Sequence, residues 1–275
     1  TEDSKNFVDR QTYFENKGLS TNTALSSVNL TDIISGGPGK DGIPAIRKPK
    51  FTSINDASIT IKLDILGIVV GSKEKKFYPY NILVWHEIVD DEVGGKPVAV
   101  TFCPLCGSAI VFSREVENKT LDFGVSGLLY QSNLLMYDNE TESLWSQVRG
   151  EAVVGYSTGK KLQVLKSDLM NFSDFKSKYP NGKVLSTDTG YSRDYSIYPY
   201  GDYDTNSEIY FPVKKFSSEL PLKEIVYAIH VNDNDVAVFP INHLKSVGKA
   251  DKAELDINGK HIVVTSKNGE IISLV

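Results

Sequence analysis

The sequence lacks several signatures that would assign a function directly. It has no apolar run approaching about twenty residues, so we expect no membrane-spanning helix. Its net charge of −5 offers no basic surface for nucleic acid. It contains no Gly-x-Ser-x-Gly motif, no phosphate-binding glycine loop and no His-Glu-x-x-His motif. With only two cysteines, the chain cannot form a complete zinc ribbon alone.

The remaining composition is that of a soluble globular protein, with 40% hydrophobic and 24% charged residues. A length of 275 residues allows one large β-rich unit or two smaller domains. The first thirty residues are polar and start at Thr1 without a methionine. This favours either a trimmed chain or a mature, exported chain from which a signal segment has been removed.

Alternating and β-branched segments predict a mainly β protein with a few short helices. Residues 1–50 form an extended N-terminal arm, 51–215 a core β domain, and 216–275 a C-terminal β unit packed on the core. One helix is expected from Ser167 to Tyr179, with a Ser-Asp cap and an end before Pro180. Strands are expected at 59–70, 77–89, 98–103, 108–114, 120–125, 134–137, 224–231, 236–239, 253–257, 261–266 and 270–274.

A weak internal repeat relates two of these β units. Val70, Pro79, Asn81 and Leu83 match Val231, Pro240, Asn242 and Leu244 at a constant interval. The first copy continues into a histidine and two cysteines, whereas the second copy has no thiol. We therefore expect the chemistry to lie in the first copy.

The two cysteines lie together in Phe102-Cys103-Pro104-Leu105-Cys106-Gly107. Such a pair can bind a soft metal, cycle between dithiol and disulfide, or close a turn as a structural disulfide. Apolar, β-branched runs precede and follow the pair, so it is expected in the turn of a β-hairpin. A thiol-disulfide oxidoreductase would typically follow the motif with a long helix. The hairpin therefore favours a metal site.

His86 and Met136 are the candidates for further metal ligands. His86 ends a strongly apolar segment, and a meander from 77 to 102 can bring it beside the thiols. A thioether beside two thiolates and an imidazole suits copper, because soft ligands select Cu(I). Zinc is the alternative metal, with Glu87, Asp138 or water completing the site. Alternatively, both residues belong to the hydrophobic core, with His86 hydrogen-bonded there and Met136 filling space.

Three other segments contain less specific candidates for functional residues. Asp41 is either a turn aspartate or a functional carboxylate. Trp145 and Gln147 belong to a strand that lines a cleft or covers the core. Arg193, in the tyrosine-rich loop 191–210, either holds an anionic ligand or forms a local ion pair.

Taken together, these segments resemble a prokaryotic family catalogued as the domain of unknown function numbered 3179. The resemblance covers about Gly36 to Val213, and the C-terminal unit fits less closely. It implies an exported or membrane-facing protein, in a family whose function is unassigned. The segments that carry the resemblance are 40–44, 80–87, 102–109, 123–130, 134–138, 143–147 and 188–195.

These observations predict an extracytoplasmic copper-binding protein for storage, delivery or electron transfer, with a metal-receiving or redox partner protein. Its ligands would be Cys103, Cys106 and His86, with Met136 possible. One alternative is a thiol-based enzyme, either a thiol-disulfide oxidoreductase or a hydrolase with Cys103 as nucleophile and His86 as base. The other is a binding scaffold with a structural Cys103–Cys106 disulfide.

Overall fold

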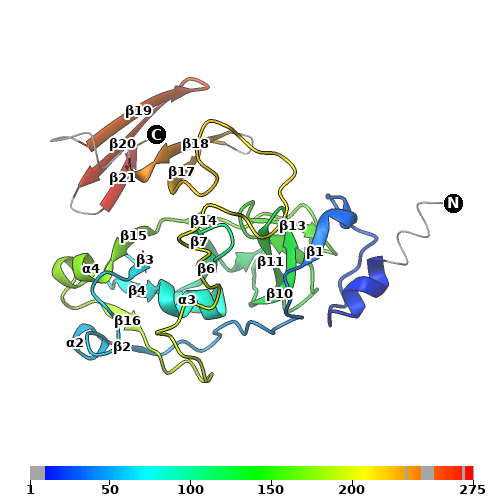
Figure 1. Cartoon of the computed structure of the whole chain (residues 1–275), viewed down its shortest axis with the longest axis horizontal. Helices are drawn as coiled ribbons and strands as arrows, with labels where there is room; N and C mark the ends of the chain where they lie inside the picture. Colours follow the sequence, from blue (N-terminus) through cyan, green and yellow to red (C-terminus); the bar gives the residue numbers. More distant parts are fainter. Residues whose placement is uncertain (1–9, 233–234, 243–250, 268–269, 275) are drawn as a thin grey trace.

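Short strands in several small sheets are the main regular structure of the chain, with 38% of the residues in strands and 12% in helices (Figure 1). The structure, a computed structural model, describes residues 10–232, 235–242, 251–267 and 270–274. The mainly β class with short helices is confirmed. Within these residues no helix is long and apolar enough to cross a membrane.

The central sheet is the predicted hairpin with one strand added on each side. Val98, Val100 and Phe102 lie in one core cluster, whereas Ala99 and Cys103 lie in another. Successive side chains of a strand point to opposite faces, so both faces of this sheet are buried. The order is β14-β7-β6-β5, with all pairs antiparallel. The bounds are β5 Ile88–Val93, β6 Lys96–Cys103, β7 Ser108–Ser113 and β14 Val164–Leu165.

A second sheet packs its strands against the face that holds Cys103. Phe123, Met136, Trp145 and Ala152 of this sheet share the core cluster of Cys103. The order is β1-β10-β11-β12-β13. The bounds are β1 Ile33–Ser35, β10 Phe123–Tyr130, β11 Asn133–Asp138, β12 Leu144–Ser146 and β13 Glu151–Val154. A small ribbon joins the two sheets, with β8 at Glu115–Val116 and β9 at Lys119–Thr120.

The third sheet has the order β15-β3-β4-β16-β2, and the short helices α2 and α4 pack on it. Its strands are β2 Phe51–Ser53, β3 Leu66–Val70, β4 Lys76–Pro79, β15 Asp168–Asn171 and β16 Lys183–Leu185. Helix α2 spans Ile54–Ala57 and helix α4 spans Phe172–Lys178. The helix predicted at Ser167–Tyr179 therefore ends before Pro180 as expected, but it begins only at Phe172. Asn171, not Ser167, caps it, because residues 168–171 pair with β3 instead.

The segment expected to continue as a strand through His86 is a helix instead. Helix α3 spans Tyr80–His86 and follows Pro79, whose extended backbone forms the N-cap. It buries Ile82, Leu83 and Val84 against the central and third sheets. Tertiary packing thus overrides the β propensity of these residues. The helix ends at Glu87, whose φ of 59° lies in the left-handed region.

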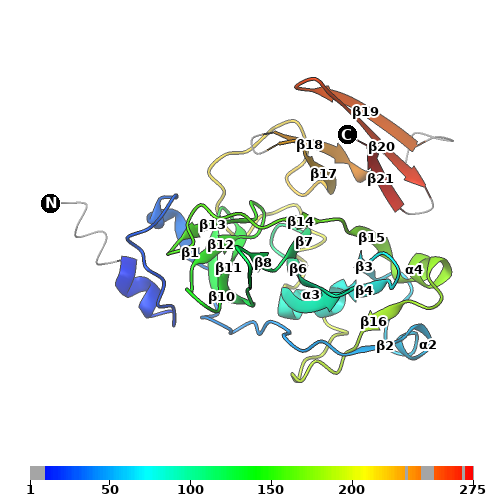
Figure 2. The same cartoon turned by 180° about the vertical axis from the view of Figure 1, so that it is seen from behind.

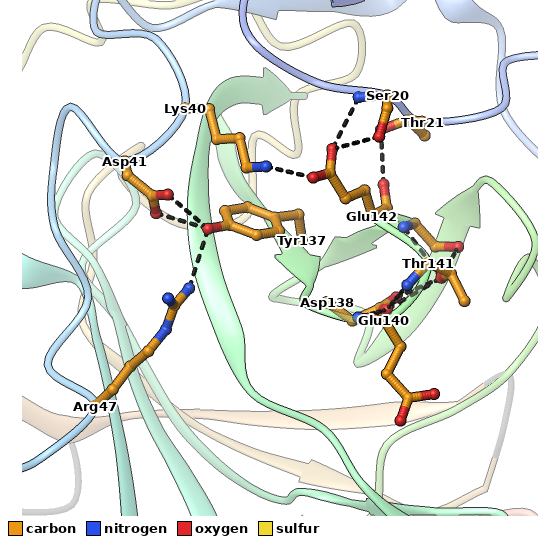
Figure 3. Close-up of polar contacts among 11 residues, drawn as sticks. Ser20, Thr21, Lys40, Asp41, Arg47, Tyr137, Asp138, Glu140, Thr141 and Glu142 are labelled. Atoms are coloured by element: carbon orange, nitrogen blue, oxygen red, sulfur yellow. Dashed lines mark hydrogen bonds and ion pairs between the residues drawn. The ribbon is translucent and has the colours of Figure 1, made fainter.

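The N-terminal segment is part of the folded core rather than an extended arm. A helix at residues 10–15 and a 3-10 turn at Leu30–Asp32 precede β1, and Phe14 and Leu19 are buried. Figure 3 shows how the following residues attach to β11. Asp41 accepts hydrogen bonds from the Tyr137 hydroxyl at 2.6 and 2.8 Å, and Arg47 donates to the same hydroxyl at 3.0 Å. Asp41 is therefore a partnered structural carboxylate.

Glu142 holds the N-terminal segment at a second point (Figure 3). Glu142 pairs with Lys40 and accepts from the backbone and hydroxyl of Ser20 at 2.8 and 2.9 Å.

The Tyr137 ring lies against Gly124, where an added Cβ would come within 2.4 Å of the ring. This close packing explains why glycine stands at that position in β10.

The C-terminal strands form a layer of their own beyond the third sheet (Figures 1 and 2). They have a separate core that includes Ile229, Phe239, Ile262 and Val264. All five predicted strands are present, as β17 Val226–His230, β18 Val236–Pro240, β19 Asp251–Ile257, β20 Lys260–Lys267 and β21 Glu270–Leu274. The division near residue 215 stays a prediction.

The internal repeat is not confirmed. Both copies contain an antiparallel hairpin that ends in proline. However, the strand registers differ: Pro79 pairs with Gly67, whereas Pro240 pairs with Val226. The position equivalent to Gly67 in the second copy is Ala228, two residues from Val226. Leu244 lies outside the described residues.

Candidate functional site

The two thiols occupy the turn of the central hairpin and differ sharply in exposure. Cys103 is the last residue of β6 and is 1% exposed, whereas Cys106 in the turn is exposed. The Cys106 amide donates to the Cys103 carbonyl at 3.3 Å, which closes the turn. Both cysteines are free thiols that lie within hydrogen-bonding range of each other.

Two polar side chains contact the Cys106 sulfur, and one of them is a fixed hydrogen-bond donor. The Asn133 amide donates to Cys106 Sγ at 3.0 Å, and the Ser108 hydroxyl lies 3.2 Å from it. Gln147 holds both groups in place: its Oε1 accepts from Ser108 at 2.8 Å and from Asn133 at 2.9 Å. The Gln147 amide in turn donates to Thr101 Oγ1 at 3.1 Å. A fixed amide that donates to sulfur stabilises the thiolate more than the thiol.

The turn that presents Asn133 has a strained backbone. Gln131 and Ser132 join β10 to β11 with φ values of 52° and 62°. Two-residue hairpin turns of this kind favour glycine or asparagine, because the left-handed region is costly for other residues. The strained turn places the Ser132 carbonyl 4.0 Å from Cys103 Sγ and Asn133 beside Cys106. Backbone strain therefore coincides with the thiol site.

The surroundings separate the acidities of the two thiols. The pKa of Cys106 is lowered to about 7, and the hydrogen bond with Cys103 is the largest cause. Burial raises this pKa, whereas hydrogen bonds with Ser108 and Asn133 lower it further. Burial raises the pKa of Cys103 well above its usual range. The thiolate is the reactive form of cysteine. Cys106, rather than the predicted Cys103, is thus the thiol suited to act as a nucleophile near neutral pH.

Glu87 is a buried carboxyl group beside the two thiols. Its carbonyl accepts from the amide of Phe102, which places it next to Cys103, and its carboxyl accepts from the Tyr200 hydroxyl at 3.1 Å. Burial raises the pKa of Glu87 to about 8, although the Tyr200 hydrogen bond lowers it. The negative charge of Cys106 contributes a further increase. A carboxyl group with this pKa can gain or lose a proton near neutral pH.

His86 does not join the thiols. Its Nδ1 lies 2.7 Å from the Pro44 carbonyl and its Nε2 lies 2.7 Å from the Tyr195 hydroxyl. A carbonyl can only accept, so Nδ1 carries the proton and Nε2 accepts from Tyr195. Burial lowers the pKa of His86, which favours this neutral form. His86 therefore anchors the tyrosine-rich loop to helix α3, and both ring nitrogens are occupied.

Met136 lies in β11 and is fully buried in the cluster that contains Cys103. Asp138 accepts from the Trp145 indole at 2.8 Å and from the Thr141 amide at 2.6 Å, so its carboxylate has structural partners. In the part of the chain that the structure describes, no three or more His, Cys, Asp or Glu side chains form a metal-binding group. Of the predicted ligands, the two cysteines come together, Met136 packs in the core cluster of Cys103, and His86 bonds elsewhere.

Residues 40–274 match a family model described as "Protein of unknown function (DUF3179)". The chain belongs to this family. The match extends past Val213, so the C-terminal strands belong to it as well. No curated protein and no solved structure matches the chain.

In this DUF3179 protein a cavity of about 890 Å³ opens beside Cys106. Its wall also includes Phe102 and Leu105 of the hairpin, Asn81 of helix α3, and the Gln131–Ser132 turn. Parts of segments 60–66 and 209–225 and of the tyrosine-rich loop also line it. Such a volume is typical of small-molecule sites.

Sequence reasoning about this DUF3179 protein missed Asn133, Ser108 and Tyr200, and treated Glu87 only as a possible metal ligand. Asn133 and Gln147 are far from the cysteines in sequence, and only sheet packing brings them to the sulfur. One available signal was Ser108, a hydroxyl two residues after Cys106 in a predicted hairpin turn.

Proposed function

We propose that this DUF3179 protein is a thiol-disulfide oxidoreductase in which Cys106 is the attacking thiolate and Cys103 the resolving thiol. One observation carries the proposal: Cys106 is an exposed sulfur with a fixed amide donor from Asn133 and a pKa near 7, beside a buried partner thiol. The best attacking thiol has a pKa near the ambient pH.

The proposed reaction begins at the exposed sulfur. The Cys106 thiolate attacks one sulfur of a substrate disulfide, forms a mixed disulfide with it, and releases the other half as a thiolate. The Cys103 thiol then loses its proton and attacks Cys106 Sγ. This step forms the Cys103–Cys106 disulfide and releases the second half of the substrate. The protein loses two electrons and the substrate gains them.

Glu87 is the proposed acceptor of the Cys103 proton. Cys103 is buried with a raised pKa, so its deprotonation needs a nearby base. Glu87 lies close enough for its charge to raise the pKa of Cys103. With a pKa of about 8, Glu87 is mostly protonated at pH 7, so the ionised fraction that can accept the proton increases as the pH rises toward 8. Tyr200 orients the carboxyl through its hydrogen bond at 3.1 Å.

A redox titration tests the proposal. In buffers of reduced and oxidised glutathione, we expect a Cys103–Cys106 disulfide to form and disappear reversibly, detected by trapping free thiols and measuring the mass. The iodoacetamide reaction of Cys106 should have a midpoint near pH 7. A midpoint at the ordinary value of about 8.5, together with no intramolecular disulfide at any buffer ratio, would overturn the proposal.

The second candidate is the expected copper function, with two thiolates as ligands. It is favoured by the adjacent Cys103 and Cys106 sulfurs and by Met136 in the cluster of Cys103. Zinc needs more protein ligands than two thiolates, and the described residues form no group of three or more His, Cys, Asp or Glu side chains. Cu(I) can be bound by fewer ligands. A metal-receiving partner and an extracytoplasmic location belong to this proposal, and the family resemblance supports only the location.

Cu(I) competition with bathocuproine sulfonate tests this candidate. If copper is the function, the protein binds one equivalent and the volume-conserving variant Met136→Leu weakens binding, because it removes the thioether. Equal affinity of Met136→Leu would assign Met136 to the core alone. Less than about one tenth of an equivalent of metal after tag-free purification, with no Cu(I) uptake, would end the copper candidate.

A further inference from the structure

We propose that the cavity beside Cys106 binds the substrate, and that this substrate is a neutral, mainly apolar, low-molecular-weight disulfide with at least one O–H or N–H group. The inference rests on the proposed exchange reaction and adds the class of substrate to it.

Two residues of the cavity wall, Ser132 and Asn81, each hold a buried polar atom, Oγ and Oδ1, that has no hydrogen-bond partner among the described residues. Ser132 is 5% exposed, and the strained turn holds it beside the thiol site. Leaving such groups unpaired costs roughly 1–3 kcal/mol each. Asn81 Oδ1 can only accept, since its amide nitrogen donates to the Tyr195 carbonyl at 3.1 Å. A ligand that donates a hydrogen bond would satisfy it.

The cavity wall is rich in apolar and aromatic surface. Tyr80 and Phe102 stack with ring centroids 4.2 Å apart, and both line the cavity. Four large apolar side chains of the wall are about half exposed: Leu66 at 45%, Ile197 at 56%, Leu222 at 56% and Ile225 at 51%. A bound apolar molecule would remove part of this surface from water.

The charged side chains of the wall favour a neutral ligand. They carry both signs, and Lys62, Asp64 and Asp204 are exposed. The Lys223 ammonium is already satisfied by the Tyr203 carbonyl and by two oxygens of Asn206. The wall therefore offers no concentrated charge of one sign to hold an ionic group.

The first test compares two disulfides with the wild-type protein: the neutral 4,4′-dithiodipyridine and the doubly anionic 5,5′-dithiobis(2-nitrobenzoate). Each rate is divided by the rate of the same reagent with glutathione at the same pH. We expect the normalised rate to be at least about tenfold higher for the neutral reagent, because its rings enter the cavity. Equal normalised rates would overturn the substrate class and leave the exchange reaction standing. Failure of both reagents to react would overturn the exchange reaction itself.

The second test measures the cavity without any thiol chemistry. N-phenyl-1-naphthylamine is neutral and apolar and carries one N–H, and 8-anilinonaphthalene-1-sulfonate has the same skeleton with a negative charge. We expect the neutral probe to bind with one equivalent, to wild type and to Cys106→Ser alike, and more tightly than the sulfonate. Absence of saturable binding of the neutral probe would overturn the binding site.

Ser132→Ala adds a readout that a structural role would not give. Ser132 Oγ has no partner among the described residues, so its removal should leave the unfolding midpoint of the free protein unchanged or raised. Affinity for the neutral probe should fall by about fivefold if the hydroxyl contacts the ligand. The matched control is Ser126→Ala, which loses a buried hydrogen bond to Leu135 and should destabilise the protein without changing probe affinity. If Ser132→Ala instead lowered the unfolding midpoint and left probe affinity unchanged, Ser132 would have a structural role and not a binding role.

Discussion

Replacement of Cys106 by serine is expected to slow alkylation of the native protein by iodoacetamide at pH 7 by at least about 100-fold. The remaining thiol, Cys103, is 1% exposed and has a raised pKa, so it is both shielded and protonated. The measurement is the rate of mass increase on adding the reagent, with unfolded protein as the reference for full accessibility.

Cys103→Ala is the matched variant, because alanine, unlike serine, has no donor for a hydrogen bond to Cys106. It should keep the fast reaction of Cys106, but its midpoint should move above pH 7, because the Cys103 thiol is the largest contribution to the low pKa of Cys106. With oxidised glutathione, this variant should accumulate a mixed disulfide at Cys106, since no resolving thiol remains. Fast alkylation of Cys106→Ser would instead identify Cys103 as the reactive thiol, as the sequence predicted.

Replacement of Glu87 by glutamine is expected to stabilise the protein at pH 8 by several kcal/mol and to leave it unchanged at acidic pH. The folded pKa of Glu87, about 8, lies above the unfolded value of 4.5. The folded state therefore holds a proton that the unfolded state releases between these values. Wild-type stability falls by about 1.4 kcal/mol per pH unit across this window through Glu87 alone. Glutamine keeps the acceptor for Tyr200 and carries no charge.

Urea unfolding of both proteins at pH 4 and pH 8, at the two ends of this window, checks this expectation. Asp90, whose pKa burial raises to about 7, has the same sign of pH dependence, but it is present in both proteins and cancels in the difference. Glu142→Gln is a control of opposite sign. Burial acts to raise the pKa of Glu142, but Lys40 and Ser20 lower it overall, so the variant should lose stability near neutral pH. A stability difference for Glu87→Gln that does not change with pH would show that Glu87 is not desolvated.

The same variant separates stability from chemistry. If Glu87 takes the Cys103 proton, Glu87→Gln should slow closure of the Cys103–Cys106 disulfide while the initial attack by Cys106 stays fast. A more stable protein with a slower second step is the combination that a purely structural carboxyl would not produce.

Local pattern determined the β class, the hairpin with both thiols in its turn, and the end of helix α4 before Pro180. These features depend on neighbours in sequence: alternating β-branched residues, a Pro and Gly turn, and a residue type that cannot continue a helix. The family could also be predicted from local segments, because each motif is short and continuous.

The tertiary structure alone decided which residues surround the thiols. The 77–89 segment has strand-like composition, yet packing folds Tyr80–His86 into a helix and turns His86 toward Pro44 and Tyr195. The same packing brings Glu87, Asn133 and Gln147 to the hairpin turn from distant positions. A pattern of residue types fixes which face a side chain occupies within its own element. The burial and hydrogen bonds that set thiol acidity arise only where separate elements meet.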